Sequence, residues 1–243
     1  LHCAAANGHR KVIKLLIKLG SRSLTSEPGR WTPIHAAAAE GHVAVVDTLI
    51  GLGSQNIDTC TERGDTPIHS AAARGHSSVI RKLVELGSQA LDTRNKYGET
   101  PIFLAAKNKH PDAIETLVLL GSKAIDIPDT YDRTPMHNAA FNGHSKTIET
   151  LARLGSQAID TLDNIGSRPV HEAARNGHSK AIETLVRLGS QALDTPNKYR
   201  MTPVRLAVHN GHADCVRILV SLGAQNKTDA PSPTEDEAAE VRY

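Results

Sequence analysis

Thr134-Pro135-Met136-His137-Asn138-Ala139-Ala140-Phe141-Asn142-Gly143-His144 opens a unit that returns along this chain every 34 residues. Its first four residues are Thr-Pro-aliphatic-His, and the same signature or a close variant begins at Thr32, Thr66, Thr100, Arg168 and Thr202. Each copy continues into an alanine-rich stretch, a Gly-His pair or a close variant, and an apolar run that ends in Leu-Gly. A unit of this length buries its apolar face only against its neighbours. The period therefore predicts a stacked array that binds along its length.

The quoted stretch also predicts its own local structure. Thr134 is placed as the N-cap of a short helix, where its hydroxyl accepts a hydrogen bond from a free backbone N–H. Pro135 follows at the first helical position, where its missing N–H costs nothing. Ala139 and Ala140 leave a nearly bare backbone, which lets a neighbouring helix approach to about 8–10 Å. Gly143 then ends the helix in a left-handed cap.

A second helix is expected from about residue 145 to residue 154. Ile148, Leu151 and Leu154 fall three residues apart, which is typical of the buried face of an amphipathic helix. Gly155 stops this helix, and the segment up to the next Thr-Pro is expected to form an extended, hairpin-like finger. Ile-Asp-Thr at 159–161 is compatible with β structure, so each unit is predicted to be helix, turn, helix, finger.

Thr-Pro-x-His-x-Ala-Ala-x-x-Gly-His, followed by an amphipathic helix and Leu-Gly-Ser, resembles the ankyrin repeat. The resemblance covers residues 1–226 and implies an all-α repeat solenoid, in which stacked helix-turn-helix units are linked by β-hairpin-like fingers. The implied units are residues 1–31 (partial), 32–65, 66–99, 100–133, 134–167, 168–201 and 202–226. Residues 227–243 form a polar tail with the composition of a disordered segment. The period of 34 exceeds the family's usual 33, and the extra residue falls in the Gly-Ser-Gln-Ala segment after the second helix.

Some copies depart from the pattern, and each departure carries a physical expectation. Lys109 stands where Gly ends the first helix, and a left-handed non-Gly residue costs about 1–2 kcal/mol. Arg168 replaces the capping Thr, which removes about 1 kcal/mol unless Ser167 takes over. Asp132 and Arg200 replace the Gly of the finger turn, where Asp tolerates a positive φ better than Arg does. The second helix of the last unit is as apolar as the interior copies, so it does not resemble a solubilising cap.

The composition limits the function classes. The net charge is +2, and no continuous basic stripe interleaved with aromatic residues appears, so nucleic acid is not an expected partner. Cys3, Cys60 and Cys215 are odd in number and share no ligand-like spacing. We therefore expect free thiols in a reducing compartment inside the cell, the cytoplasm by default. No apolar run approaches the roughly 18 residues that span a bilayer. The chain begins in mid-repeat, which we interpret as a fragment of a longer protein.

Thirteen histidines do not suggest a metal or acid–base site here. All but His209 fall in two repeated slots, the one in Thr-Pro-x-His and the one in Gly-His. In the ankyrin family these slots resemble structural hydrogen-bonding positions. The chain has no Gly-x-Gly-x-x-Gly or Walker-type run, and its carboxylates recur once per unit rather than in pairs. We therefore predict no catalytic residue, no metal and no cofactor; an enzyme domain elsewhere in the full protein stays open.

Binding residues are expected where the copies differ. By resemblance to ankyrin arrays, partners lie in a concave groove made by finger tips and first-helix surfaces. The tip row stands three residues before each Thr slot and comprises Gly29, Arg63, Tyr97, Tyr131, Ile165 and Tyr199. The first-helix row follows the alanine pair and comprises Ala39, Ala73, Lys107, Phe141, Arg175 and His209.

From these rows we predict nine contact residues: Arg63, Tyr97, Tyr131, Tyr199, Lys107, Phe141, Arg175, His209 and the neighbouring Arg133. Tyrosine supplies a large, stiff, amphipathic contact area that suits binding hot spots. Packing of each tyrosine on the adjoining finger explains the tip row equally well. A merely solvated charge is the alternative for Arg133 and Arg175.

The sequence thus predicts an intracellular protein–protein interaction module, a monomeric scaffold or adaptor that binds a protein partner. Two alternatives remain: a recruiting domain of a larger enzyme or channel, and a structural spacer without a specific ligand. Neither nucleic acid nor membrane insertion is expected. Units stacked about 10 Å apart would form a groove of about 60–70 Å, which suits a protein surface or an extended peptide better than a small molecule.

Overall fold

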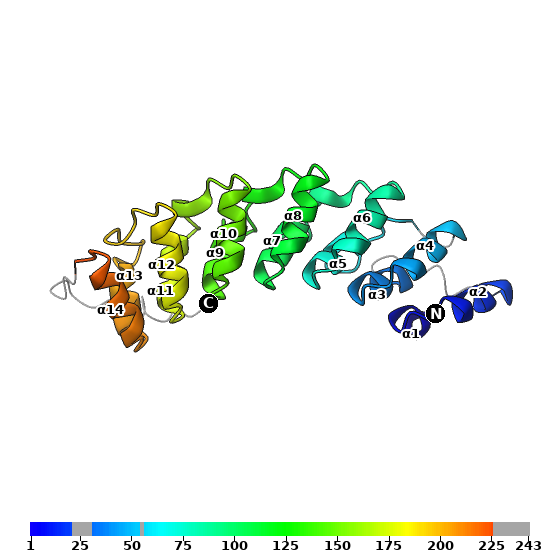
Figure 1. The fold of residues 1–243 in the computed structure, drawn as a ribbon, viewed down its shortest axis with the longest axis horizontal. Helices are drawn as coiled ribbons and strands as arrows, with labels where there is room; N and C mark the ends of the chain where they lie inside the picture. The colour runs from blue at the N-terminus through cyan, green and yellow to red at the C-terminus, as the bar shows by residue number, and fades with distance from the viewer. Residues whose placement is uncertain (21–30, 54–55, 226–243) are drawn as a thin grey trace. The chain divides into compact units, whose positions relative to one another are not determined.

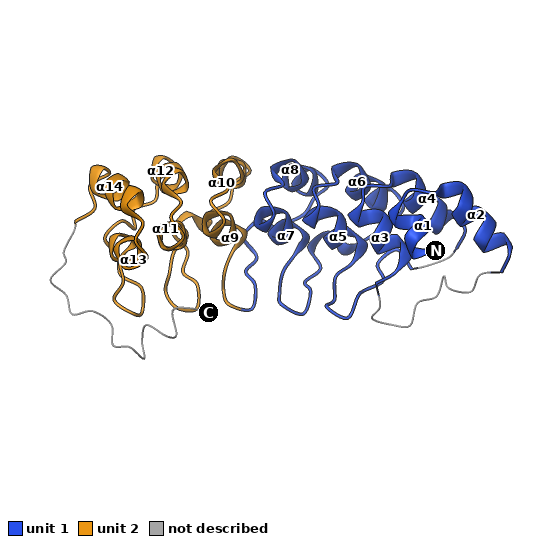
Figure 2. Ribbon diagram, turned by 90° about the horizontal axis from the view of Figure 1, so that it is seen from below, with its two compact units in different colours: residues 1–130 blue, residues 131–243 orange. Residues whose placement is uncertain are grey.

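The computed structural model describes residues 1–20, 31–53 and 56–225. Seven pairs of α-helices follow one another, and no strand forms in the residues that it describes. This agrees with the predicted all-α repeat solenoid. The chain divides into two compact units, residues 1–130 and residues 131–243 (Figure 2). Two features of the sequence, Gly29 in the tip row and the tail 227–243, lie outside the described residues.

The first unit holds four helix pairs, each made of a short first helix and a nine-residue second helix (Figure 1). Its first helices are α1 (His2–Ala6), α3 (Pro33–Ala39), α5 (Pro67–Ala73) and α7 (Pro101–Lys107). Its second helices are α2 (Arg10–Lys18), α4 (Val43–Gly51), α6 (Ser77–Glu85) and α8 (Pro111–Leu119). Successive first helices contact one another, and so do successive second helices. The result is two helical layers with the fingers beyond the layer of first helices (Figure 2).

The second unit repeats this arrangement with three pairs. Its first helices are α9 (Pro135–Phe141), α11 (Pro169–Arg175) and α13 (Pro203–His209). Its second helices are α10 (Ser145–Arg153), α12 (Ser179–Arg187) and α14 (Ala213–Ser221). Contacts run between α9 and α11 and between α11 and α13, and likewise from α10 through α12 to α14.

The predicted caps form at both ends of the first helices. The hydroxyl of Thr134 accepts a hydrogen bond from the backbone N–H of His137, over 3.4 Å. At Arg168, where the cap is lost, Ser167 does not take over, because its hydroxyl accepts from the side-chain amide of Asn197. The N–H of His171 instead bonds the carbonyl oxygen of Arg168, over 2.9 Å.

The C-terminal ends of the first helices use left-handed residues as predicted. After α5, Gly75 has a φ of +76°, and the N–H of His76 returns to the carbonyl of Ala71, the bond of a Schellman motif. Lys109 takes the same conformation with a φ of +66°. In the finger turns, Asp132 and Arg200 each have a φ of +59°, where other copies have Gly. Three non-Gly residues are therefore held in a strained region of the backbone map.

The core is thin and mostly aliphatic. Alanine pairs such as Ala71 and Ala72 are fully buried between neighbouring first helices, and Ile80 and Leu83 fill the space beneath the second helices. Phe103 occupies a histidine slot and is fully buried. The small side chains explain how helices this short can stack closely.

One local prediction was wrong. Of residues 159–161, which were expected to be β-compatible, only Thr161 has an extended backbone. Ile159 and Asp160 lie in a 3₁₀ turn, η3 (Ala158–Asp160), and η1 (Ala90–Asp92) and η2 (Ala124–Asp126) match it. The turn brings the Asp160 carboxylate to the next repeat, where it accepts from the Ser190 hydroxyl (2.6 Å) and the Gln191 N–H (2.8 Å). This bridge uses the Gly-Ser-Gln-Ala segment that lengthens the period to 34, so the extra residue has a structural role.

The last helix pair presents apolar surface, as expected from its sequence. Val208 of α13 is 52% exposed, whereas Ala174 is fully buried at the equivalent position of α11. Val220 and Leu222 are also exposed. The last described repeat therefore exposes an apolar side chain, Val208, at a position that is covered in an interior repeat.

Candidate partner-binding surface

Where the Thr-Pro-x-His slot holds a histidine, as at His35 and His171, that histidine joins the first helix to the finger that follows it. The backbone N–H of Thr32 donates to Nδ1 of His35 (3.3 Å), so Nε2 carries the proton and donates to the carbonyl of Asp65 (2.9 Å). His171 repeats this arrangement with Arg168 and Thr195. Burial lowers the pKa of His35 to about 4 and that of His171 to about 4, against the opposing effect of their carbonyl partners. Neutral, fully bonded rings of this kind are structural.

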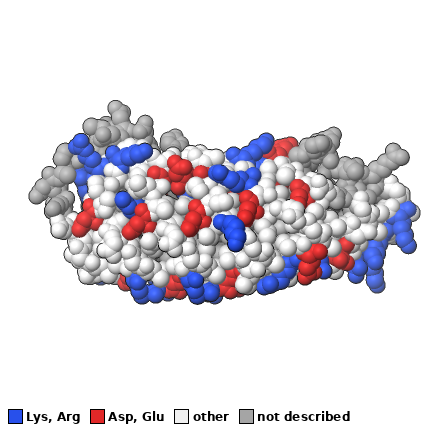
Figure 3. Space-filling view, turned by 90° about the horizontal axis from the view of Figure 1, so that it is seen from above, with Lys and Arg blue, Asp and Glu red and all other residues white. Residues whose placement is uncertain are grey.

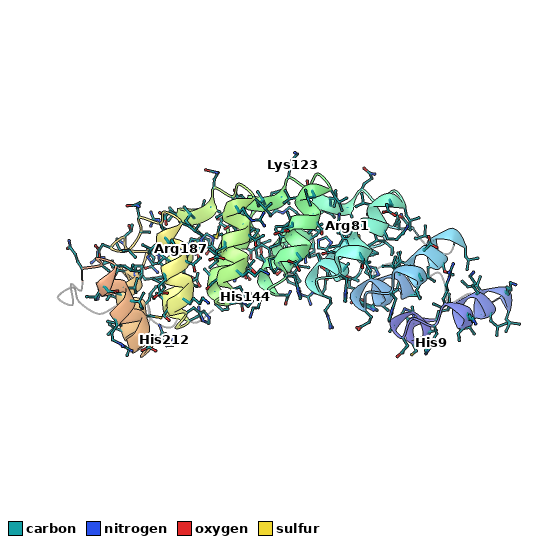
Figure 4. The ribbon with its side chains drawn as sticks, in the orientation of Figure 1. His9, Arg81, Lys123, His144, Arg187 and His212 are labelled. Carbon is teal, nitrogen blue, oxygen red and sulfur yellow. The ribbon has the colours of Figure 1, made fainter. Side chains whose placement is uncertain are left out.

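Histidines of the Gly-His slot bond in the opposite direction. His42 Nε2 lies 2.9 Å from the carbonyl oxygen of Ala6, and His212 Nε2 lies 3.0 Å from that of Arg175, each in the preceding repeat. Figure 4 labels three members of this series, His9, His144 and His212, each at the start of a second helix. The predicted role of the two slots, to tie repeat to repeat, is confirmed by these bonds. No group of three His, Cys, Asp or Glu side chains suited to a metal occurs in the described part of the chain.

The fingers hold the tip row rigidly. In the finger of Tyr97, the side-chain oxygen of Asn95 accepts from the N–H of Tyr97 (2.9 Å) and of Glu99 (3.0 Å). The backbone also links neighbouring fingers, because the carbonyl of Arg63 accepts from Lys96 N–H (2.8 Å) and that of Tyr97 from Thr130 N–H (3.0 Å). In the second unit, Tyr131 and Ile165 carbonyls accept in the same way from the next finger. Hydrogen bonds therefore hold the backbone at the described tip residues Arg63, Tyr97, Tyr131 and Ile165.

Tip-row side chains remain accessible on this scaffold. Tyr97 is 47% exposed and Tyr131 54% exposed, while Tyr199 is partly buried. The guanidinium of Arg63 lies 5.0 Å from the Tyr97 ring centroid, and that of Arg133 lies 4.9 Å from the Tyr131 ring. Each of these two tyrosines thus has a cation over its ring. The packing alternative accounts for part of each ring, and about half of each side chain is exposed.

Lys107, in the first-helix row, is held by a buried carboxylate. Its ammonium lies 2.9 Å from Glu99, which also accepts from the side-chain amide of Asn95 (3.0 Å). Burial alone would raise the pKa of Glu99, but the hydrogen bonds from Asn95 and Lys107 hold it below its ordinary value. The Lys107 side chain keeps 42% of its surface exposed, so its stem can still be covered by a partner.

In the second unit, the first-helix row contains Phe141, Arg175 and His209. Phe141 ends α9 and is 42% exposed, in contrast to the fully buried Phe103. His209 ends α13 and is exposed. Arg175 is not a solvated charge, because only 14% of its side chain is exposed and its Nη1 lies 3.7 Å from Glu172.

Glu172 and Asp163 are buried carboxylates that the sequence analysis did not single out. Burial raises the pKa of Glu172, against the opposing charge of Arg175, and it also raises the pKa of Asp163. Glu172 stands directly after a Thr-Pro-x-His histidine slot, where other copies have Ala36, Ser70, Leu104, Asn138 and Leu206. That variation was the available signal, but the pattern could not show that the side chain is buried beside Arg175.

Trp31, the single tryptophan of the chain, was not among the predicted contact residues. It is 47% exposed and lies beside a hollow of about 120 Å³ at the surface of α3, α5 and α7. Trp31 stands directly before a Thr slot, in a row otherwise occupied by Asp65, Glu99, Arg133, Ser167 and Met201. The sequence feature that could have identified Trp31 as a candidate contact residue is that no other residue of this row is aromatic.

Charges are interspersed on the face drawn in Figure 3, where acidic and basic side chains alternate without a continuous basic stripe. Some form ion pairs between repeats, such as Arg187 of α12 with Glu149 of α10 (2.5 Å; Arg187 is labelled in Figure 4). All three cysteines are free thiols. None of the described helices has the length and apolar character needed to cross a membrane.

Comparisons with known proteins agree with this architecture. A protein-family profile described as "Ankyrin repeats (3 copies)" matches residues 1–93, 44–130, 86–161 and 155–230. A solved structure, the human ASB11 ankyrin repeat domain, is similar over 92% of this chain and 97% of its own, with 25% sequence identity and a TM-score of 0.79. No curated protein sequence matches the chain.

Proposed function

Since this chain belongs to the ankyrin-repeat family, whose members are generally non-catalytic protein–protein interaction modules, we propose that it binds a protein partner through its tip row and first-helix row. The proposal places this chain inside the cell, as a scaffold or adaptor that positions its partner. It requires no metal, cofactor or catalytic residue of the chain.

The tip row carries the proposal. Three of the four tyrosines stand in this one row, and Tyr97 and Tyr131 are about half exposed above a backbone that neighbouring fingers hydrogen-bond. A partner therefore meets large aromatic side chains whose backbone is already ordered, and binding costs less conformational entropy. Exposed aromatic residues on a rigid frame have the character of hot spots.

Two alternatives predict different behaviour. A spacer would need only the framework, and it gives no reason for tyrosines to collect at exposed tips. A recruiting domain of a larger enzyme or channel would use the same surface, so it differs from an adaptor only in what lies elsewhere in the protein. The tip row favours a binding role over a spacer role.

A pull-down from a cytosolic extract tests the proposal. The baits are the wild-type chain and a triple variant, Tyr97→Ala, Tyr131→Ala and Tyr199→Ala, with its fold confirmed by circular dichroism. A matched control replaces three exposed apolar residues of second helices, Val12→Ala, Leu119→Ala and Val220→Ala. We expect the wild type and the control to capture the same protein and the tip variant to lose it. Capture by all three baits would contradict the tip row as the binding site.

A further inference from the structure

Three departures from the repeat pattern meet at one place in the first unit. Trp31 provides an exposed ring, Ala39 and Ala73 provide short side chains, and Arg74 provides an exposed guanidinium. All four residues line the hollow of about 120 Å³, together with Leu104 and others. We call this feature the Trp31 hollow.

Short side chains in the first-helix row leave the hollow open. Later repeats carry Lys107, Phe141, Arg175 and His209 at the positions that are Ala39 and Ala73 here. A long side chain at position 73 would occupy the space that now lies between Trp31 and Leu104. The hollow is therefore a local property of the first repeats rather than a general feature of the repeat.

Arg74 also departs from a structural pattern. Asn stands at the equivalent position of four later repeats, and there its side-chain amide bonds a carbonyl of its own helix, as Asn108 does with Leu104 over 2.8 Å. Arg74 gives up that helix cap. Its side chain makes no ion pair or hydrogen bond with any described residue and stays exposed at the rim. The framework gives no reason for this arginine, whereas a ligand with a carboxylate does.

The negative charge on the rim, that of Asp65, already has partners within the protein. Asp65 accepts from the side-chain amide of Asn95 (2.8 Å), and its other oxygen lies 4.0 Å from Arg63. The charge left for a ligand is therefore the positive one of Arg74. A guanidinium pairs best with a carboxylate, through parallel hydrogen bonds.

The volume limits what fits the hollow. Clefts for drug-sized ligands start at roughly 300 Å³, and a cavity of about 150 Å³ is enough for benzene. A space of about 120 Å³ thus suits one aliphatic side chain. The alanine methyl groups, Leu104 and the Trp31 ring form the apolar part of its wall, which such an occupant requires, and Asp65, His69, Ser70 and Arg74 complete the lining.

We infer that the Trp31 hollow receives an aliphatic side chain of an acidic peptide segment, whose neighbouring Asp or Glu pairs with Arg74. This inference rests on the proposed function and names the chemistry of the partner. The tip row of the same unit, with Arg63 and Tyr97, then contacts the rest of the segment.

Phage-displayed random dodecapeptides, selected on the full chain, test the inference. Two variants follow residues that the repeats themselves use: Ala73→Lys, as in Lys107, fills the hollow, and Arg74→Asn, as in Asn108, removes the charge. We expect selected peptides to share an aliphatic residue within three positions of Asp or Glu. Ala73→Lys should weaken their binding at least tenfold. Arg74→Asn should weaken it about tenfold at low salt and less at high salt.

The single tryptophan gives an independent readout, because binding in the hollow must change the fluorescence of Trp31. Peptides without the aliphatic–acidic pair, or peptides that bind Ala73→Lys as well as the wild type, would overturn the inference. A selection in which no peptide is enriched on the wild-type chain relative to Ala73→Lys would also overturn it. Peptides that ignore Ala73→Lys but lose binding to the triple tyrosine variant would leave the proposed function standing and remove only the hollow.

Discussion

Acid should destabilise the fold at two identified histidines, His35 and His171. Both rings are neutral in the folded state because burial disfavours the charged form, and in this neutral form Nδ1 accepts a backbone N–H. Their pKa lies at about 4 in the folded chain, against an ordinary value of 6.5. The unfolded chain therefore binds a proton first as the pH falls, and the stabilisation present above pH 6.5 is lost between pH 6.5 and pH 4.

The size of the effect follows from the two pKa values. They differ by 2.5, and one whole unit corresponds to about 1.36 kcal/mol. Complete protonation thus removes about 3 kcal/mol of stability for each ring. At pH 5 the unfolded ring is almost fully protonated and the folded ring is not, so the loss between pH 7 and pH 5 is about 2 kcal/mol for each histidine.

Phe103 supplies the matched variant, since the chain itself buries a phenylalanine in this slot. We expect His171→Phe to fold, and the free energy of unfolding should fall less steeply with acid than in the wild type. The difference between the two proteins should shift by about 2 kcal/mol in favour of the variant between pH 7 and pH 5. Urea unfolding measured at both pH values gives this difference.

Two results would refute the reasoning. One is a difference between wild type and His171→Phe that stays constant within about 0.5 kcal/mol across this range. The other is an NMR titration in which the Cε1 proton of His171 in the folded chain reports a pKa near 6.5. Either would mean that the ring is hydrated and accepts a proton without breaking its bonds.

Three further changes test the framework. Gly143→Ala should lower the free energy of unfolding by at least about 1 kcal/mol more than Gly155→Ala. Both residues have a positive φ, but only at Gly143 would an added Cβ lie 2.5 Å from His178 Nδ1. Equal losses in urea unfolding would contradict that contact. Lys109→Gly should raise the midpoint of thermal unfolding by relieving about 1 kcal/mol of left-handed strain, and an unchanged or lower midpoint would argue against the cap. Asp160→Ala should lower the free energy of unfolding by about 2–3 kcal/mol, because it removes two hydrogen bonds to a partly exposed carboxylate. A loss under about 0.5 kcal/mol in urea unfolding would show that water replaces these hydrogen bonds.

Local features of the fold were predictable because each depends on neighbours in the chain. Thr134 caps its helix and Gly143 ends it through contacts within a few residues. The 3₁₀ turn at 158–160 was not predictable in the same way. In this turn the Asp160 carboxylate accepts hydrogen bonds from Ser190 and Gln191 of the next repeat. A β-compatible sequence of three residues does not indicate such distant partners.

The candidate binding surface was likewise predictable only in part. The tip row and first-helix row follow from alignment of the copies, and the structure leaves Tyr97, Tyr131 and Phe141 exposed. The alternative hypothesis treats Arg175 as a solvated charge, yet only 14% of its side chain is exposed and its guanidinium lies 3.7 Å from Glu172. Burial depends on how closely α11 packs with its neighbours, and a repeat alignment contains no such distance.

The sequence by itself determined the period, the helix caps, the left-handed positions and the membership of each variable row, because these are set by contacts within one repeat. Only the tertiary structure decided which side chains of different repeats lie next to one another. Trp31 comes from one copy and Ala73 and Arg74 from another, and they form one hollow because stacking brings residues more than 40 positions apart to the same surface. The neutral state of His35 was decided there too, since burial in the stack lowers its pKa, against the opposing effect of its hydrogen bond to the Asp65 carbonyl.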